Sequence, residues 1–118
     1  MDESEVMQRI MMEAAKNGVI LWRNNSGALT DKEGRLVRYG LGNSSIKTNA
    51  TFKSSDLIGI MPDGKFIAVE CKRSDWNHKI VEGSREDAQW AFIKFINAHG
   101  GVAGFCSSVT EFEMLIGK

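Results

Sequence analysis

Apolar side chains recur along this chain with two different spacings, which predict its helices and its strands. Over Glu3–Lys16 they recur every three or four residues, the spacing of an amphipathic helix with one buried face. The same spacing predicts a helix over Arg85–His99, which two glycines end, and a short helix over Val109–Ile116. The apolar stripe of the first helix consists of Val6, Met7, Ile10, Met11, Ala14 and Ala15.

Short apolar runs rich in β-branched residues predict the strands. These runs are Val19–Arg23, Asp56–Met61, Lys65–Lys72 and Val102–Cys106. Only Pro62, Asp63 and Gly64 separate the second run from the third. Proline suits the first position of a turn and glycine can adopt the left-handed conformation, so these two runs are predicted to form a β-hairpin.

A long connection, Asn24–Ser55, is rich in Gly, Ser, Asn and Thr. Its length of roughly 30 residues far exceeds the usual connection, and loops of this length tend to be functional. We expect a hairpin through Asp31–Gly34 within it, and contact with substrate. The predicted order of elements is α, β, β, β, α, β, α, which is a mixed α/β fold.

Length and composition fit one compact domain over residues 1–118. A chain of 118 residues with 42% hydrophobic content can bury a core without disulfides or a structural metal. The apolar runs fall short of the roughly 18 residues that span a membrane, and the acidic start Met1–Glu5 lacks the basic region of a signal peptide. We therefore expect a soluble, cytoplasmic protein that does not contact a membrane.

The cysteines and histidines do not predict a zinc site. Cys71 and Cys106 lie inside apolar runs, which favours reduced thiols in the core. His78 and His99 are the only histidines, too few for the usual ligand sets.

The net charge of zero argues at first against nucleic acid as a partner, but it conceals how the charges are distributed. From Arg35 to Lys53 the charged residues are all basic. A patch that contacts phosphates would have this composition, and an ordinary solvated loop explains it about as well. These basic residues are Arg35, Arg38, Lys47 and Lys53.

The predicted hairpin brings two acids together. A loop of three residues pairs Ile58 with Ala68 and therefore Asp56 with Glu70. Directly opposed side chains share one face of the sheet with Cβ atoms about 5 Å apart. Strand alternation places Lys72 on the same face.

The electrostatic repulsion between these two acids must be offset. Two carboxylates at this distance repel by roughly 3 kcal/mol at an effective dielectric constant near 20. A divalent cation such as Mg²⁺, held by Asp56, Glu70 and the backbone carbonyl of Cys71, would offset the repulsion. A salt-bridged strand end at a solvent edge is the competing interpretation. The apolar strand around Glu70 makes this interpretation less favourable, because burying a charge there is costly unless the charge has a function.

This chemistry suits hydrolysis of a phosphodiester bond. The reaction needs a metal to neutralise the phosphate and activate water, and a cation near the developing charge. Lys72 would either position the attacking water or stabilise the transition state, and the sequence does not separate these roles.

At these residues the chain resembles the PD-(D/E)xK nuclease superfamily, whose signature is an acid on one strand and an E-x-K triplet on the next. Here the signature is Asp56 with Glu70-Cys71-Lys72, and Ser55 replaces the proline before the first acid. Further segments are similar to the VRR-NUC branch of that superfamily, so that the resemblance covers nearly the whole chain. They are Leu21–Gly27, Ser55–Gly59, Ala88-Gln89 and Gly100–Gly104.

The resemblance implies a restriction-endonuclease-like fold, dependence on Mg²⁺ or Mn²⁺, and cleavage of DNA directed by its structure. Short stand-alone members occur in phages and bacteria, act as homodimers and resemble Holliday-junction resolvases. By position, Glu5 matches an acid of the first helix thought to reach the metal, directly or through water, and Gln89 matches a glutamine beside the site. Glu5 fits an exposed helix acid equally well, and Gln89 a surface amide nearly as well.

Further residues are candidates for contact with DNA. Trp76 lies in a polar segment and is a candidate for DNA contact or a dimer interface, whereas core packing is the favoured role of Trp22 and Trp90. Lys and Arg supply the sequence-independent part of DNA affinity. The candidate phosphate contacts are Arg23, Arg38, Lys53, Arg73 and Lys79.

The leading hypothesis is a homodimeric, Mg²⁺- or Mn²⁺-dependent endonuclease that recognises branched DNA such as a Holliday junction. Two sites in a symmetric dimer would suit paired strand cuts. The first alternative is a DNA-binding module of the same fold that does not cut. The second is a structural or inhibitory protein, which predicts no metal binding.

Overall fold

The computed structural model describes the backbone of residues 1–118 and every side chain except that of Ile46. Its helices are α1 (Glu3–Lys16), α2 (Ile46–Thr51), α3 (Arg85–Ala98) and α4 (Val109–Leu115). Its strands are β1 (Ile20–Arg23), β2 (Gly27–Thr30), β3 (Leu36–Tyr39), β4 (Leu57–Ile60), β5 (Phe66–Cys71) and β6 (Val102–Cys106).

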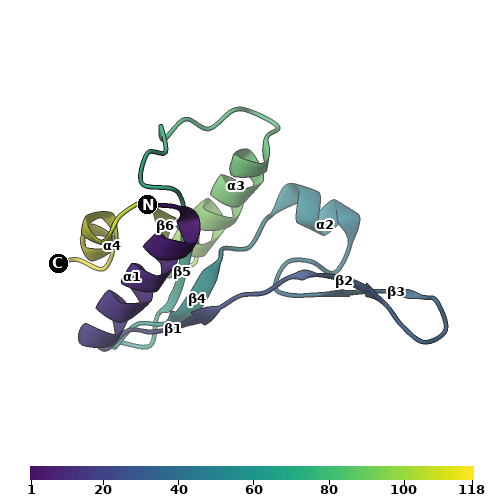
Figure 1. Cartoon of the computed structure of the whole chain (residues 1–118), viewed down its shortest axis with the longest axis horizontal. Coiled ribbons are helices and arrows are strands. Elements are labelled where there is room, and N and C mark those ends of the chain that lie inside the picture. The colour runs from purple at the N-terminus through teal and green to yellow at the C-terminus, as the bar shows by residue number, and fades with distance from the viewer.

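A mixed sheet of order β1-β4-β5-β6 forms the centre of the molecule. β4 is antiparallel to both β1 and β5, and β6 runs parallel to β5 after the crossover through α3. Helices α1 and α4 cover one face of the sheet and α3 covers the other (Figure 1). The predicted mixed α/β fold is confirmed.

Strand β5 is the most buried element because helices cover both of its faces. Ile67 and Val69 point into the core beneath α1 and α4, which Ile10 and Phe112 complete. Ala68 points into the core beneath α3. This double coverage explains why the strand is apolar almost throughout its length.

The sequence predicts most element bounds closely. Helix α1 and strand β6 agree with their predicted ranges at both ends, and Asp2 caps α1 by accepting a hydrogen bond from the Glu5 N–H at 2.9 Å. In the β4–β5 turn the Gly64 N–H bonds to the Met61 carbonyl at 2.8 Å, and Gly64 has a φ of +90°. The predicted three-residue loop and its pairing of Ile58 with Ala68 are confirmed.

The connection before β4 contains more structure than its sequence pattern predicts. The expected hairpin is present as β2 and β3, which form a separate two-stranded sheet. Helix α2 was not predicted, so the simple order α, β, β, β, α, β, α is wrong over this segment. Six residues are too few for a helical period to emerge, and the Ser45 side chain that caps α2 also fits a turn.

Tryptophan burial also differs from expectation. Trp22 is 45% exposed and Trp90 is 36% exposed, so core packing is wrong for Trp22 and only partial for Trp90. Helix α3 lies over β5 and β6 and leaves the face of β1 that carries Trp22 uncovered. Cys71 and Cys106 are buried free thiols, as expected. Among the helices described, each is too short or too polar to cross a membrane.

Candidate active site

The β4–β5 hairpin positions both acids of the predicted site. Asp56 directly precedes β4 and Glu70 lies near the end of β5, and the register that pairs Leu57 with Val69 continues to this pair. The Cys71 N–H donates a hydrogen bond to Asp56 Oδ2 at 2.9 Å, which fixes the Asp56 carboxylate against the end of β5. On the other side of β4, Gly59 permits the close approach of β1, since a Cβ there would collide with the Ile20 carbonyl.

Glu70 is an acid buried inside the protein. Its side chain is 4% exposed, and its pKa is raised from an ordinary 4.5 to about 10. Burial is the largest cause, a hydrogen bond with Asp56 and the negative charge of Asp56 add to it, and the positive charges of Lys72 and Arg85 act in the opposite direction. Without a bound cation, Glu70 therefore holds a proton at neutral pH.

Lys72 lies beside the acids and is itself buried, at 6% exposed. Its ammonium donates a hydrogen bond to Gln89 Oε1 at 2.8 Å and contacts Glu86 Oε1 at 3.3 Å. Both partners come from the first turns of α3, and Gln89 is 3% exposed. Helix α3 therefore fixes the amine, which lines a neighbouring cavity and whose positive charge acts to lower the pKa of Glu70.

A small polar cavity of about 90 Å³ contains the two acids. Two cations, Lys53 and Arg85, line it together with Gln89. The buried Ser55 Oγ, also in its lining, has no hydrogen-bond partner among the described residues. The remaining lining residues are Asn24, Ser26, Asn49 and Ser54.

The donor set of this cavity fits a hard divalent cation. Mg²⁺ binds proteins through one or two carboxylates and keeps its other positions for water and phosphate oxygens. Asp56 and Glu70 supply that number. Within the part of the chain that the structure describes, no group of three or more His, Cys, Asp or Glu residues could hold a metal. A metal here would depend on these two acids and on neutral oxygens.

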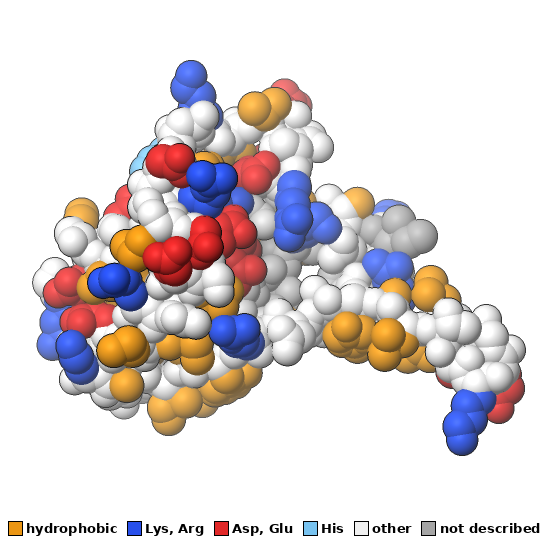
Figure 2. Space-filling model, in the orientation of Figure 1, with side chains coloured by type: hydrophobic (Ala, Val, Ile, Leu, Met, Phe, Trp, Pro, Cys, Tyr) orange, Lys and Arg blue, Asp and Glu red, His pale blue; other side chains and the backbone are white. Residues whose placement is uncertain are grey.

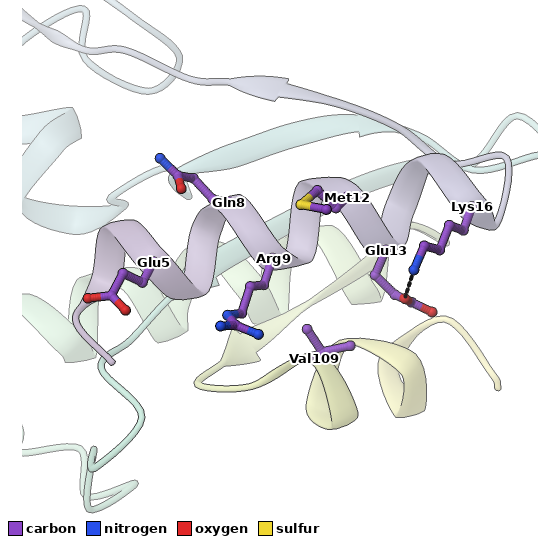
Figure 3. Close-up of a pocket in the computed structure, with 7 residues that line it drawn as sticks. All are labelled: Glu5, Gln8, Arg9, Met12, Glu13, Lys16 and Val109. Carbon is purple, nitrogen blue, oxygen red and sulfur yellow. Dashed lines mark ion pairs between the residues drawn. The ribbon is translucent and has the colours of Figure 1, made fainter.

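Glu5 does not join the acids. It lines a larger cavity of about 690 Å³ along the outer side of α1, with Arg9, Glu13 and Val109 of α4 (Figure 3). Glu3 is the α1 acid on the side of Lys72, and both line a third cavity next to Glu86. The hydrogen bond from the Ser74 N–H to the Met1 carbonyl, at 3.1 Å, holds this end of α1 near the end of β5.

The predicted phosphate contacts are dispersed. Lys53 lines the acid cavity, where its ammonium bonds to Asn49 Oδ1 at 2.5 Å, and Arg73 lines the cavity beside Lys72. Arg38 donates to Asn43 Oδ1 at 2.7 Å. Arg23 and Lys79 are exposed outside these cavities.

Trp76 is half-buried beside Lys72. Its ring lies 4.9 Å from the ring of Phe105 and 4.6 Å from that of His78, centroid to centroid. The Lys72 ammonium lies 5.6 Å from the Trp76 ring centroid. The tryptophan thus packs against the amine as well as lining its cavity.

Sequence reasoning missed three polar residues of this region. Arg85 and Glu86 begin α3, and the spacing of four residues between Arg85 and the predicted Gln89 could have indicated Arg85. Asn24 bonds to Ser54 Oγ and the Ser55 carbonyl and so joins β1 to the segment before Asp56. Only the β1–β4 pairing, which depends on tertiary structure, brings Asn24 there.

Comparison of the chain with family models, with curated proteins and with solved structures finds no match.

Proposed function

We propose that this protein is a metal-dependent nuclease that hydrolyses phosphodiester bonds in DNA. The observation that carries the proposal is the meeting of Asp56 and Glu70 in one polar cavity, with Lys72 on the next same-facing position of the strand. The mixed sheet and its crossover helix suit the restriction-endonuclease-like core that the sequence resemblance implies. The matching residues of the VRR-NUC branch extend that resemblance beyond the acids.

The two acids would bind a divalent cation, Mg²⁺ or Mn²⁺. Burial and the neighbouring Asp56 leave Glu70 with a raised pKa, so the carboxylate form lacks compensation without a cation. The two carboxylates would hold a divalent ion in place of the Glu70 proton, and the ion would supply that compensation. When bound, it would supply charge neutralisation at the phosphate and activation of water. The Cys71 carbonyl remains the proposed third oxygen.

Lys72 would act on the substrate through its ammonium. Its hydrogen bond to Gln89 and its ion pair with Glu86 fix the amine, and its charge acts on Glu70. From there it orients the attacking water or stabilises charge in the transition state. Gln89 is a positioning residue, because it reaches the reaction through Lys72.

The charged lining of the acid cavity favours a phosphate substrate. Lys53 and Arg85 offer cations in the same cavity as the acids, and Asn24 offers an amide. A cavity of about 90 Å³ accommodates one group of phosphate size rather than a nucleoside. The substrate proposal is therefore backbone recognition, with branched DNA as the form that the VRR-NUC resemblance favours.

The test is incubation of the protein with labelled four-way junction, flap, nicked and plain duplex DNA. Each substrate is incubated with Mg²⁺, with Mn²⁺ or with chelator. We expect cleavage that needs the metal and is abolished by Asp56→Asn. Asp63→Asn, in the exposed β4–β5 turn, is the matched control and should cut normally. Binding of DNA without any cutting would instead support a non-catalytic DNA-binding module, and cleavage in chelator would eliminate the metal mechanism.

A further inference from the structure

Four aromatic side chains form a continuous track at the β6 edge of the central sheet. In order they are His78, Trp76, Phe105 and Trp90. Successive ring centroids lie 4.6, 4.9 and 6.2 Å apart, and the last two rings are stacked with an interplanar angle of 25°. The rings come from the segment after β5, from β6 and from α3, so the aromatic track joins three parts of the chain.

The aromatic track adjoins the candidate active site. Phe105 is the β6 partner of Glu70, and the Lys72 ammonium lies 5.5 Å from the centroid of the Phe105 ring. Trp90 directly follows Gln89, whose side chain bonds to Lys72. Because Glu70 and Gln89 both line the acid cavity, the track leads up to that cavity.

The Trp90 end of the track is open to solvent. Trp90 is 36% exposed, although the indole is one of the largest apolar groups a protein carries. The exposed Lys94 ammonium lies 5.6 Å from the centroid of its ring and forms no ion pair among the described side chains. An open aromatic ring with an unpaired cation beside it can stack on a base and bind its phosphate.

A cavity of about 360 Å³ lies beside the track, lined by Trp76 and Lys72. Its size is that of sites for small organic ligands. Both of its cations are paired with acids that also line it, Lys72 with Glu86 at 3.3 Å and Arg73 with Asp75 at 3.3 Å. This lining suits a base with its sugar, whereas the smaller acid cavity suits a phosphate.

We propose that the aromatic track binds single-stranded DNA, with one base stacked on Trp90 and a neighbouring nucleoside in the cavity beside Lys72. The inference rests on the proposed function for the path of the strand, whose backbone enters the acid cavity. It narrows the substrate to DNA with an unpaired strand at the cut, such as a flap. The bases of an intact duplex stack on one another and do not reach an aromatic ring.

The charges of the molecule favour a single strand over a duplex. Affinity for duplex DNA comes mainly from Lys and Arg contacts with phosphates. The chain has a net charge of zero, and Figure 2 shows basic side chains interspersed with acidic ones on the face in view, without a continuous basic surface there. Stacking on aromatic rings adds affinity for any base and needs no excess of positive charge.

The first test is fluorescence anisotropy with a labelled oligo-dT, in chelator so that no DNA is cut. We expect the single strand to bind about 10-fold more tightly than a duplex of the same length. Trp90→Ala should weaken binding of the single strand about 10- to 100-fold, because it removes the ring on which the base stacks. Trp90→Phe keeps an aromatic ring and should retain most of the affinity.

Trp22→Ala is the matched control, because Trp22 is an exposed tryptophan on β1, away from the track. It should bind the oligonucleotide like the unmodified protein. Equal affinities of Trp90→Ala and Trp22→Ala, with both variants folded by circular dichroism, would overturn the proposal. So would a Trp90→Phe protein that binds as weakly as Trp90→Ala, or a duplex bound as tightly as the single strand.

Cleavage separates this inference from the proposed function. With Mg²⁺ and a flap substrate, Trp90→Ala should raise KM with little change in kcat, since the ring binds the strand and leaves the acids in place. Metal-dependent cutting with the same KM in Trp90→Ala and the unmodified protein would refute the track and leave the nuclease standing. Binding of oligo-dT that needs Trp90, without cutting of any substrate, would refute the nuclease and leave single-strand binding standing.

Discussion

The ammonium of Lys72 donates a 2.8 Å hydrogen bond to the side-chain oxygen of Gln89, and both side chains are more than nine-tenths buried. The bond links the end of β5 to the first turns of α3. A buried ammonium has a fixed direction only while its acceptors are fixed. The position of the amine relative to Asp56 and Glu70 therefore depends on α3.

Replacing Gln89 with alanine tests this dependence. We expect Gln89→Ala to lower kcat about 10- to 100-fold with little change in KM, because it misdirects Lys72 without removing a substrate contact. Gln8→Ala, on the exposed side of α1, is the control and should cut normally. Single-turnover cleavage measures the effect. A rate equal to that of the unmodified protein would remove Gln89 from the site.

Glu70→Gln tests the cost of the buried acid. Because the folded-state pKa of Glu70 is about 10 against an ordinary 4.5, the folded protein binds the proton more tightly than the unfolded chain. Without metal, Glu70 therefore lowers stability as pH rises above about 4.5, and the loss continues until about pH 10. At pH 7 Glu70→Gln should raise the free energy of unfolding by about 3 kcal/mol.

Urea unfolding at several pH values in chelator measures this difference. The gap between Glu70→Gln and the unmodified protein should widen with pH and vanish near pH 4. Glu82→Gln, an exposed glutamate before α3, is the matched control and should show no such trend. A gap that stays constant with pH would contradict the burial of a protonated Glu70.

The observed positions of the acids show which parts of this site could be predicted from the sequence. The distance along the chain between Asp56 and Glu70 is spanned by one tight turn, so strand alternation and a three-residue loop were sufficient to pair them. Glu5 was assigned from resemblance alone, and its direction depends on how α1 rotates over the sheet. That rotation is set by Val6 and Ile10 in the core and leaves Glu5 on the outer side.

The position of the β2–β3 hairpin could not be predicted from the local sequence pattern. Its turn could be predicted from Asp31 and Gly34, because both are typical turn residues. Nothing local determines whether a hairpin joins the central sheet or stands apart. The prediction that Trp22 is packed in the core was wrong for the same reason, since the burial of Trp22 depends on how far α3 extends across β1.

Magnesium should stabilise the protein through the two acids. A ligand that binds only the folded state adds about 2.7 kcal/mol when present at 100 times its dissociation constant. We therefore expect Mg²⁺ to raise the Tm of the unmodified protein and to leave that of Asp56→Asn unchanged. Asp63→Asn should respond like the unmodified protein. Calorimetric titration gives the affinity, and equal responses of the two variants would place the ion elsewhere.

Ser55 offers a test of the cavity that does not depend on cutting. Its hydroxyl is buried beside Asp56 with no hydrogen-bond partner among the described side chains and backbone, which costs about 1 to 3 kcal/mol of desolvation. Ser55→Ala removes that cost and should stabilise the metal-free protein by about 1 kcal/mol. Ser54→Ala should instead destabilise it, because the Ser54 hydroxyl bonds to Asn24 and to the Leu41 carbonyl. Thermal unfolding that ranks the two variants in the opposite order would show that the Ser55 hydroxyl is satisfied.

Lys53 and Arg85 should bind backbone phosphates rather than bases. Lys53→Ala and Arg85→Ala should each weaken binding to all DNA sequences alike and reduce the slope of log affinity against log salt by about 1. Lys65→Ala is the control, since Lys65 lies in the β4–β5 turn, 3.6 Å from Asp63 and outside the acid cavity. Fluorescence anisotropy with Asp56→Asn as the common background measures binding without cleavage. An unchanged slope in both variants would mean that phosphates do not enter the cavity, and Arg85 would then serve only to lower the pKa of Glu70.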